Sequence, residues 1–327
     1  MKNKHVLWIA LFGFLALLGG LAACGGGGGG NGGGGVEIPY SYTGRTDQAV
    51  ITADNAVAIV QHLSSYGYIT EPIDEVAIGI IDEAGLITDP RDLPYLRVVG
   101  ICGGYYILQF QFDKSTDSFT GNVKFVDYCV DSGDDNLYLT GTVPFDGSLF
   151  ETQETLTFTL NLTVDDVSSR IENDSRSFNY GTIIYEYFSS STDESENYIF
   201  NYVLQDNFNQ FKTYWTDDTE LIFNYVYDAS YDDFTLGGRF YENDYGFVDI
   251  ETVGKIIVSP DETKTGVILI LGKGSKAKLT FNADGSNILE VDADNDGEFD
   301  DGSFENVLQL FPRGIFFEQG INGSINS

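Results

Sequence analysis

The chain has 327 residues, with 17 Lys and Arg against 50 Asp and Glu, which gives a net charge of −33. So acidic a chain excludes nucleic acid as a partner, because phosphate binding depends on clustered Lys and Arg. Hydrophobic residues make up 42% and aromatic residues 14%, which excludes a chain that is disordered by composition. The composition therefore predicts a folded, acidic protein.

The first 23 residues have the three-part layout of a secretory signal. Two lysines are followed by an apolar run over residues 6–18 and by Leu-Ala-Ala before Cys24. The four residues ending in Cys24 resemble a bacterial lipobox, in which the cysteine becomes the mature N-terminus and carries a covalent lipid. We expect two or three acyl chains to anchor it to a membrane. The alternative is an ordinary signal, or an uncleaved anchor helix, with a chance cysteine.

A glycine-rich tether follows over residues 24–35. Between Gly25 and Gly35 the only other residue is Asn31, and such a chain behaves as a flexible coil with a reach of about 18 Å. Gly25 stands where lipoproteins of this kind often carry the Asp that retains them in the inner membrane. The resemblance therefore implies a location in the outer membrane, facing the periplasm or the cell surface.

Residues 36–100 predict a small helical segment that packs on a sheet. Apolar residues recur at helical spacing between Thr52, a good N-cap, and Gly67, which predicts a helix of about four turns. A second pattern runs over residues 74–84, with acids at its start and Gly85 placed as its stop.

Residues 101–327 predict an antiparallel β domain. Polar and apolar residues alternate over residues 155–164, as in a strand with one wet face. A five-residue run at 199–203 recurs at 222–226, an interval that favours a meander growing one hairpin at a time. Three pairs are hairpin signals: Asp146-Gly147, Asp284-Gly285 and Asp296-Gly297. The predicted fold is mainly β. It is a large antiparallel meander that either curls into an open barrel or splits into a sandwich.

Two cysteines make this prediction specific. Pairing Cys102 with Cys129 across a hairpin places Tyr106 opposite Phe125 and sorts apolar and polar residues onto separate faces along the ladder. We therefore predict a structural disulfide in an oxidising compartment, which stabilises the fold by about 3–4 kcal/mol. Two free or metal-binding thiols are the alternative, although the chain offers no suitably spaced His or further Cys to complete such a site.

The segment 292–300, Asp-Ala-Asp-Asn-Asp-Gly-Glu-Phe-Asp, resembles a calcium loop. It alternates oxygen ligands and places Gly at the sixth position for a sharp turn. The twelfth position is Ser303 instead of Glu, and the preceding residues are strand-like, so any ion would sit in a hairpin loop with Asp301 or Glu305 as an extra ligand. The alternative is a solvated acidic turn. The predicted Ca²⁺ ligands are Asp292, Asp294, Asp296, Glu298 and Asp300.

Other motifs do not support catalysis. His62 has no nucleophile elbow to serve, so we interpret it as a solvated or structural histidine. The segment 272–276 lacks the spacing of a phosphate loop and reads as a basic hairpin turn. With 50 acids in the chain, no carboxylate pair stands out for glycoside hydrolysis.

Taken over nearly its full length, the chain resembles a group of uncharacterised proteobacterial lipoproteins. The resemblance rests on Cys24 with its polyglycine tether, the hairpin joining Cys102 and Cys129, the run at 246–250 and the late Asp-rich loop. It implies a location and an architecture, and it supplies no catalytic residues.

From these observations we expect an outer-membrane lipoprotein of the cell envelope. Its body would act as a non-enzymatic binding or structural module stabilised by Ca²⁺, with a protein or small-molecule partner that the sequence does not identify. One alternative is a carrier of an apolar ligand, which requires an apolar cavity inside a curved sheet. The other is a hydrolase, which requires two acids with separated pKa values in a cleft.

Overall fold

The computed structural model describes most of the chain from residue 39 to residue 307. The predicted signal, Cys24, the tether and Gly67 lie outside the described residues. These residues are 39–64, 70–86, 95–132, 135–165, 167–171, 174–207, 211–226, 231–259 and 263–307.

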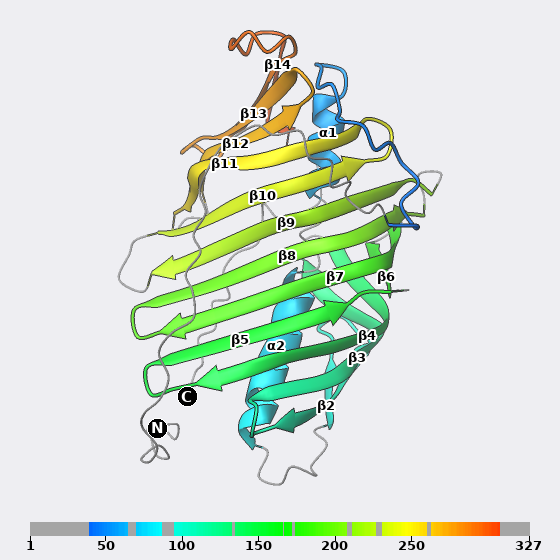
Figure 1. The fold of residues 1–327 in the computed structure, drawn as a ribbon, viewed down its shortest axis with the longest axis vertical. Coiled ribbons are helices and arrows are strands. Elements are labelled where there is room, and N and C mark those ends of the chain that lie inside the picture. The colour runs from blue at the N-terminus through cyan, green and yellow to red at the C-terminus, as the bar shows by residue number, and fades with distance from the viewer. Residues whose placement is uncertain are drawn as a thin grey trace.

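The described residues form two helices followed by one antiparallel sheet of fifteen strands, which confirms the predicted mainly β class (Figure 1). Neighbouring strands follow chain order, except that β6 pairs with both β4 and β7. All strands belong to a single sheet with β1 and β15 at opposite ends, so the body is an open curved sheet. The strands are β1 (Tyr95–Val99), β2 (Tyr105–Asp113), β3 (Ser118–Ser132), β4 (Asp135–Glu151), β5 (Thr155–Thr163), β6 (Val167–Ile171), β7 (Asp174–Ser190), β8 (Asp193–Asp206), β9 (Thr213–Val226), β10 (Asp232–Glu242), β11 (Gly246–Val258), β12 (Lys264–Gly272), β13 (Ser275–Phe281), β14 (Asn287–Asp292) and β15 (Gly302–Glu305).

Helix α1 (Ala56–Ser64) begins four residues after Thr52, the predicted N-cap, and a turn over residues 53–55 leads into it. The carbonyl of Thr52 accepts the amide of Ala56, and the amide of Thr52 donates to Asn55 Oδ1 at 2.8 Å. These contacts satisfy groups that a helix start leaves without intrahelical partners. The helix has 9 residues, which is shorter than the predicted four turns.

Helix α2 (Thr70–Leu86) is longer than predicted and includes Gly85, so the prediction that this glycine stops the helix is wrong. Its apolar stripe continues to Ala84, which is buried against the sheet, and tertiary packing of such a stripe outweighs the local cost of a glycine. Pro72 lies in its first turn, where a missing amide hydrogen costs nothing.

The sheet curls around α2 to form a trough, by which we mean the concave face of β3–β8. Adjacent helix residues Asp74 and Glu75 contact Tyr198 on β8 and Tyr128 on β3. These strands are four spacings apart, about 19 Å in a flat sheet, whereas a helix is about 10–12 Å wide. The sheet must therefore curve, as Figure 1 shows for β2–β4 behind α2.

The Cys102–Cys129 disulfide is present with its Cα atoms 5.3 Å apart, and the predicted register is confirmed. Tyr106 lies opposite Phe125 in the β2–β3 ladder. A bulge at Asp127, where φ is +46°, separates this ladder from Cys129.

Two turn predictions are confirmed and one is wrong. Gly285 and Gly297 lie in turns with φ of +82° and +101°. Asp146-Gly147 instead lies inside β4, because the strand continues beneath the Phe119 ring: a Cβ on Gly147 would lie 2.5 Å from Phe119 Cζ.

The repeated runs at 199–203 and 222–226 lie on β8 and β9, which are adjacent antiparallel strands. The interval between them therefore spans one long strand with its turn, so the prediction of one hairpin for each repeat is wrong. The alternation predicted over residues 155–164 is confirmed in β5, where Phe158, Leu160 and Leu162 are buried.

An N-terminal strap, residues 39–51, crosses to the sheet face opposite the helices. Tyr42 packs on Trp215 and Tyr241, with ring centroids 6.0 and 5.7 Å away. The amide of Ile51 donates to Ser275 Oγ at 2.7 Å where the strap returns toward α1. The segment 36–100 thus contributes more than helices, since β1 also lies within it and pairs with β2.

Candidate functional site

The Asp-rich loop joins β14 to β15 as a hairpin loop. Strand β14 ends at Asp292, and β15 begins at Gly302. Two residues have left-handed backbone conformations, Asn295 with φ +59° and Gly297 with φ +101°, and they let the chain turn tightly between the acids. The strands on both sides agree with the prediction of a hairpin loop instead of a helix-loop-helix.

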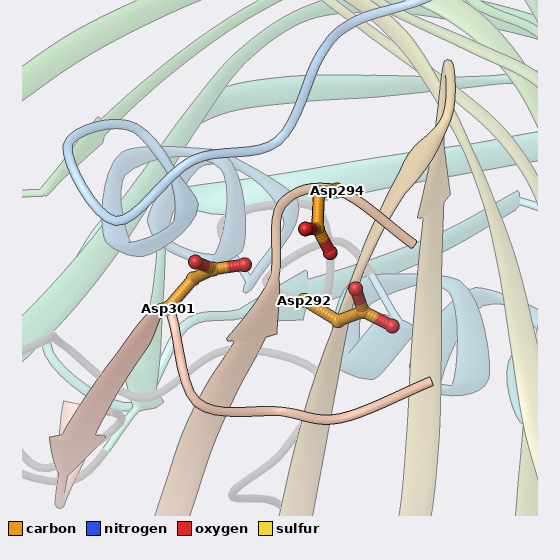
Figure 2. A group of neighbouring side chains, drawn as sticks. All are labelled: Asp292, Asp294 and Asp301. Carbon is orange, nitrogen blue, oxygen red and sulfur yellow. The ribbon is translucent and has the colours of Figure 1, made fainter. Parts of the chain in front are cut away.

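Three carboxylates of this loop come together. Ligand oxygens of Asp292, Asp294 and Asp301 lie within 4.8 Å of one another, and Figure 2 shows these side chains where the loop leaves β14 and enters β15. Two of them belong to the predicted ligand set, and Asp301 is one of the two extra ligands considered from the sequence. The grouping does not include the other predicted ligands, Asp296, Glu298 and Asp300.

Asp292 is the buried member of the group, with no exposed surface. Its Oδ1 accepts the amide of Asp296 at 3.1 Å, and its Oδ2 accepts the amide of Gly297 at 3.1 Å. Lys276 Nζ lies 3.1 Å from the same Oδ2. Burial alone would raise the pKa of Asp292, but the hydrogen bonds from Lys276 and from backbone amides lower it, so the carboxylate is ionised at neutral pH.

Two lysines of β13 supply positive charge beside the loop. Lys276 and Lys278 lie over the Phe299 ring, 5.3 and 4.6 Å from its centroid, and Lys278 pairs with Glu290 at 2.7 Å. A cation entering the loop would therefore compete with Lys276 for Asp292. The hard oxygen ligands suit Ca²⁺, whereas soft metals prefer sulfur or imidazole.

The predicted basic hairpin turn at 272–276 is confirmed as the turn between β12 and β13. Gly274 there has φ +61°, and the amide of Lys273 donates to the carbonyl of Ala49 at 2.7 Å. The turn therefore binds the N-terminal strap, and it holds Lys276 beside the Asp-rich loop.

His62 attaches α1 to the sheet, as expected of a structural histidine. Its Nδ1 lies 3.1 Å from Glu242 Oε1, and its Nε2 lies 3.3 Å from the Tyr214 hydroxyl. Glu242 is fully buried, and its Oε2 accepts the amides of Asp244 and Tyr245 at 2.7 and 2.8 Å. Sequence reasoning missed Glu242, because nothing near it in the sequence marks it as the partner of His62.

A second cluster of acids and tyrosines lies in the trough beneath the start of α2. The hydroxyl of Tyr198 contacts Asp74 Oδ1 and lies 3.2 Å from Glu196 Oε2, while the hydroxyl of Tyr225 lies 3.4 Å from the same oxygen. The pKa of Glu196 is raised to about 7, chiefly by burial and also by the charge of Glu194, while the hydroxyls of Tyr198 and Tyr225 oppose the rise. Glu196 was also missed from the sequence, where it is one acid among 50.

An apolar cavity of about 30 Å³ lies between α2 and the floor of the trough. Its lining includes Ile73 and Val76 from the helix and Val123 and Ile183 from the sheet. Its lining exposes no polar surface, so the cavity suits apolar groups only.

Within the part of the chain that the structure describes, neither helix combines the length and the hydropathy needed to cross a bilayer. No family model, curated protein or solved structure matches the chain. The resemblance to envelope lipoproteins therefore stays a prediction.

Proposed function

We propose that this chain is a lipid-anchored protein of the outer membrane whose folded body is a non-enzymatic binding or structural module stabilised by Ca²⁺. Cys24 would carry the lipid, and the loop at 292–301 would bind the ion. The observation that carries the proposal is the convergence of Asp292, Asp294 and Asp301.

The backbone of the loop supports an ion site. The amide of Asp296 donates to Asp294 Oδ1 at 3.2 Å as well as to Asp292, and the amide of Ala293 donates to Asp301 Oδ2 at 2.6 Å. These bonds fix the carboxylates before an ion arrives, so little ordering remains to oppose binding. Competition from Lys276 favours modest affinity, about 10⁻⁴–10⁻³ M as in extracellular Ca²⁺ modules.

The positions of the perturbed acids support a non-enzymatic module. Glu196 is buried beneath α2 and hydrogen-bonded within the fold, so a substrate would reach it only after the helix moves. His62 is engaged with Glu242 and Tyr214 and serves to attach a helix.

Thermal unfolding of residues 36–327 tests the ion site. With a dissociation constant of about 1 mM, 10 mM Ca²⁺ would stabilise the wild type by about 1.4 kcal/mol relative to chelator. For a chain of this size that is about 2 °C in Tm. The same concentration of Mg²⁺ should act less, because Mg²⁺ demands a rigid octahedral site.

The variants Asp294→Asn and Asp301→Asn should abolish the response to Ca²⁺. The matched control is Asp284→Asn, because Asp284 lies in an exposed turn and likewise accepts a backbone amide, from Ser286 at 2.9 Å. An equal response in all four proteins, or no response in the wild type, would refute the ion site.

A carrier of apolar ligands is the second candidate, and the apolar cavity under α2 favours it. It requires saturable binding of a fatty acid or a similar molecule by the wild type. Tryptophan substitution of Val76, which lines the cavity, should block that binding. If the substituted protein bound the fatty acid as tightly as the wild type, the trough would be ruled out as the carrier site.

A further inference from the structure

Helix α2 is attached to the trough by side chains, with one acid directed to each side. Glu75 accepts the hydroxyl of Tyr128 from β3, and Asp74 accepts the hydroxyl of Tyr198 from β8. The Tyr106 hydroxyl also donates to the carbonyl of Glu75 at 3.3 Å. The helix thus spans the trough and closes over its apolar floor.

The contact on the β8 side is short of protons. The single hydroxyl proton of Tyr198 can be donated to only one carboxylate, yet the oxygen of Tyr198 touches both Asp74 and Glu196. If Tyr198 donates to Asp74, its lone pairs face Glu196 Oε2 at 3.2 Å. That contact is attractive only when Glu196 is protonated and donates to Tyr198.

None of the groups that act on Glu196 within the described residues is a cation. A carboxylate buried among acids and phenols, without a cation, keeps its proton to unusually high pH. Raising the pH therefore removes a proton that the cluster needs. The groups that act on one another in this cluster are Asp74 on α2, Tyr185 and Tyr187 on β7, Glu194, Glu196 and Tyr198 on β8, Tyr225 on β9 and Asp232 on β10.

We propose that the first turn of α2 is a pH-sensitive lid over the apolar trough, docked while Glu196 is protonated and released when Glu196 ionises. Burial raises the pKa of Glu196 to about 7, which places the change near neutral pH. Ionisation leaves two negative carboxylates on either side of one hydroxyl in a buried site.

The helix is the part that moves. Glu196 and Tyr198 belong to β8, whose backbone pairs with both β7 and β9. Asp74 is tied to the sheet through its side chain, so moving it breaks no strand pairing. Separation of the two charges therefore lifts the start of α2 instead of distorting the sheet.

Lifting this turn uncovers apolar surface. Pro72, Ile73 and Val76 line the cavity from the helix side, and Val123 and Ile183 line it from the sheet. A neutral environment-sensitive dye such as N-phenyl-1-naphthylamine should bind once the turn is released. A neutral dye is preferred because the chain carries a charge of −33.

The experiment is a dye titration of the folded chain from pH 5.5 to pH 9. In the wild type, fluorescence should rise several-fold with a midpoint near 7. Glu196→Gln keeps a donor beside Tyr198 and cannot ionise, so its fluorescence should stay low throughout. Glu194→Gln, a neighbouring acid on the same strand, should retain the rise.

Two further measurements keep the test decisive. Tyr198→Phe removes the shared hydroxyl and should give high dye fluorescence at every pH. Hydrogen exchange of residues 70–86, corrected for intrinsic rates, should be faster at pH 8.5 than at pH 6 in the wild type alone. An identical dye profile in Glu196→Gln, or unchanged protection of α2 while dye binds, would overturn the lid. The lid and the Asp-rich loop involve different strands, so failure of one leaves the other standing.

Discussion

The two ends of the sheet neutralise their acids by different means. In the trough, Asp74 and Glu196 lie among tyrosine hydroxyls, and the cluster depends on a proton. At the β10–β15 end, Asp292 is matched by the ammonium group of Lys276 and by backbone amides. Similar acids thus respond in opposite ways to pH, because the compensating positive charge is mobile in one region and fixed in the other.

In each region, the direction of the pKa shift determines whether stability falls or rises with pH. Asp292 has a lowered pKa, so its contribution to stability is present above its unfolded value and is lost as the pH falls through the folded value. Glu196 has a raised pKa, so its contribution is present at acidic pH and is lost as the pH rises through about 7. One end of the molecule weakens in acid, and the other end weakens toward alkaline pH.

The largest expected effect concerns the attachment of α1. Glu242→Ala removes the carboxylate that lies 3.1 Å from His62 Nδ1, and it leaves the amides of Asp244 and Tyr245 without their buried acceptor. We expect the free energy of unfolding to fall by about 3 kcal/mol, measured by denaturant titration. Glu251→Ala on exposed surface is the control and should change stability by less than about 0.5 kcal/mol. If Glu242→Ala lowered the free energy of unfolding by no more than the control does, Glu242 would not attach α1.

The pH dependence of the free energy of unfolding should show whether Glu196 in the trough keeps its proton in the folded protein. Between pH 4.5 and 7 the unfolded chain has lost the proton of Glu196 while the folded chain keeps it, so stability falls with rising pH by about 1.4 kcal/mol per unit. Other acids add their own slopes, so the measured quantity is the difference between wild type and Glu196→Gln in denaturant titrations at several pH values. Parallel curves would contradict the prediction.

Tyr128→Phe tests the other side of α2. It removes the hydroxyl that donates to Glu75, and we expect a loss of about 1–2 kcal/mol. Because Tyr128 does not contact Glu196, the change in pH slope caused by Glu196→Gln should be the same in Tyr128→Phe as in the wild type. A smaller change in Tyr128→Phe would show that the two attachments of α2 are a single unit.

The smallest effect should come from the exposed charges beside the Asp-rich loop. Lys278→Ala breaks an ion pair with Glu290 in which both side chains are about 30% exposed, and such pairs contribute less than about 1 kcal/mol.

Lys276→Gln, in contrast, removes the cation that competes for Asp292. It should lower the Ca²⁺ dissociation constant, measured by calorimetry, several-fold. Equal Ca²⁺ affinity in the two variants would remove Lys276 as a competitor.

Local patterns predicted much of this fold. Alternation identified β5, and the two cysteines fixed the β2–β3 register, because a one-residue slip would have reversed every side chain. The pair Asp146-Gly147 was wrongly predicted to be a turn. A glycine that makes room for a neighbouring ring cannot be distinguished in the sequence from a glycine that turns the chain.

The sites were harder to predict than the fold. Asp292 and Asp294 lie in a motif and were found, whereas Tyr198 and Asp74 are 124 residues apart and meet only because the sheet curls. Burial distinguishes Glu196 and Glu242 from most of the other acids, and burial is a property of the tertiary structure. Sequence reasoning therefore recovers sites built within one loop and misses those built across the trough.

The strap and the chain-order meander together set an order for folding. Each strand from β2 onward can pair with one already formed, so the sheet can lengthen as synthesis proceeds, with β6 the single departure. The strap leaves the ribosome early, yet Gln48 bridges to Phe247 and Ile51 binds Ser275, which are made about two hundred residues later. The earliest part of the body is thus among the last to complete its contacts, and a chain truncated before β11 would lack those that the strap makes with Phe247 and Ser275.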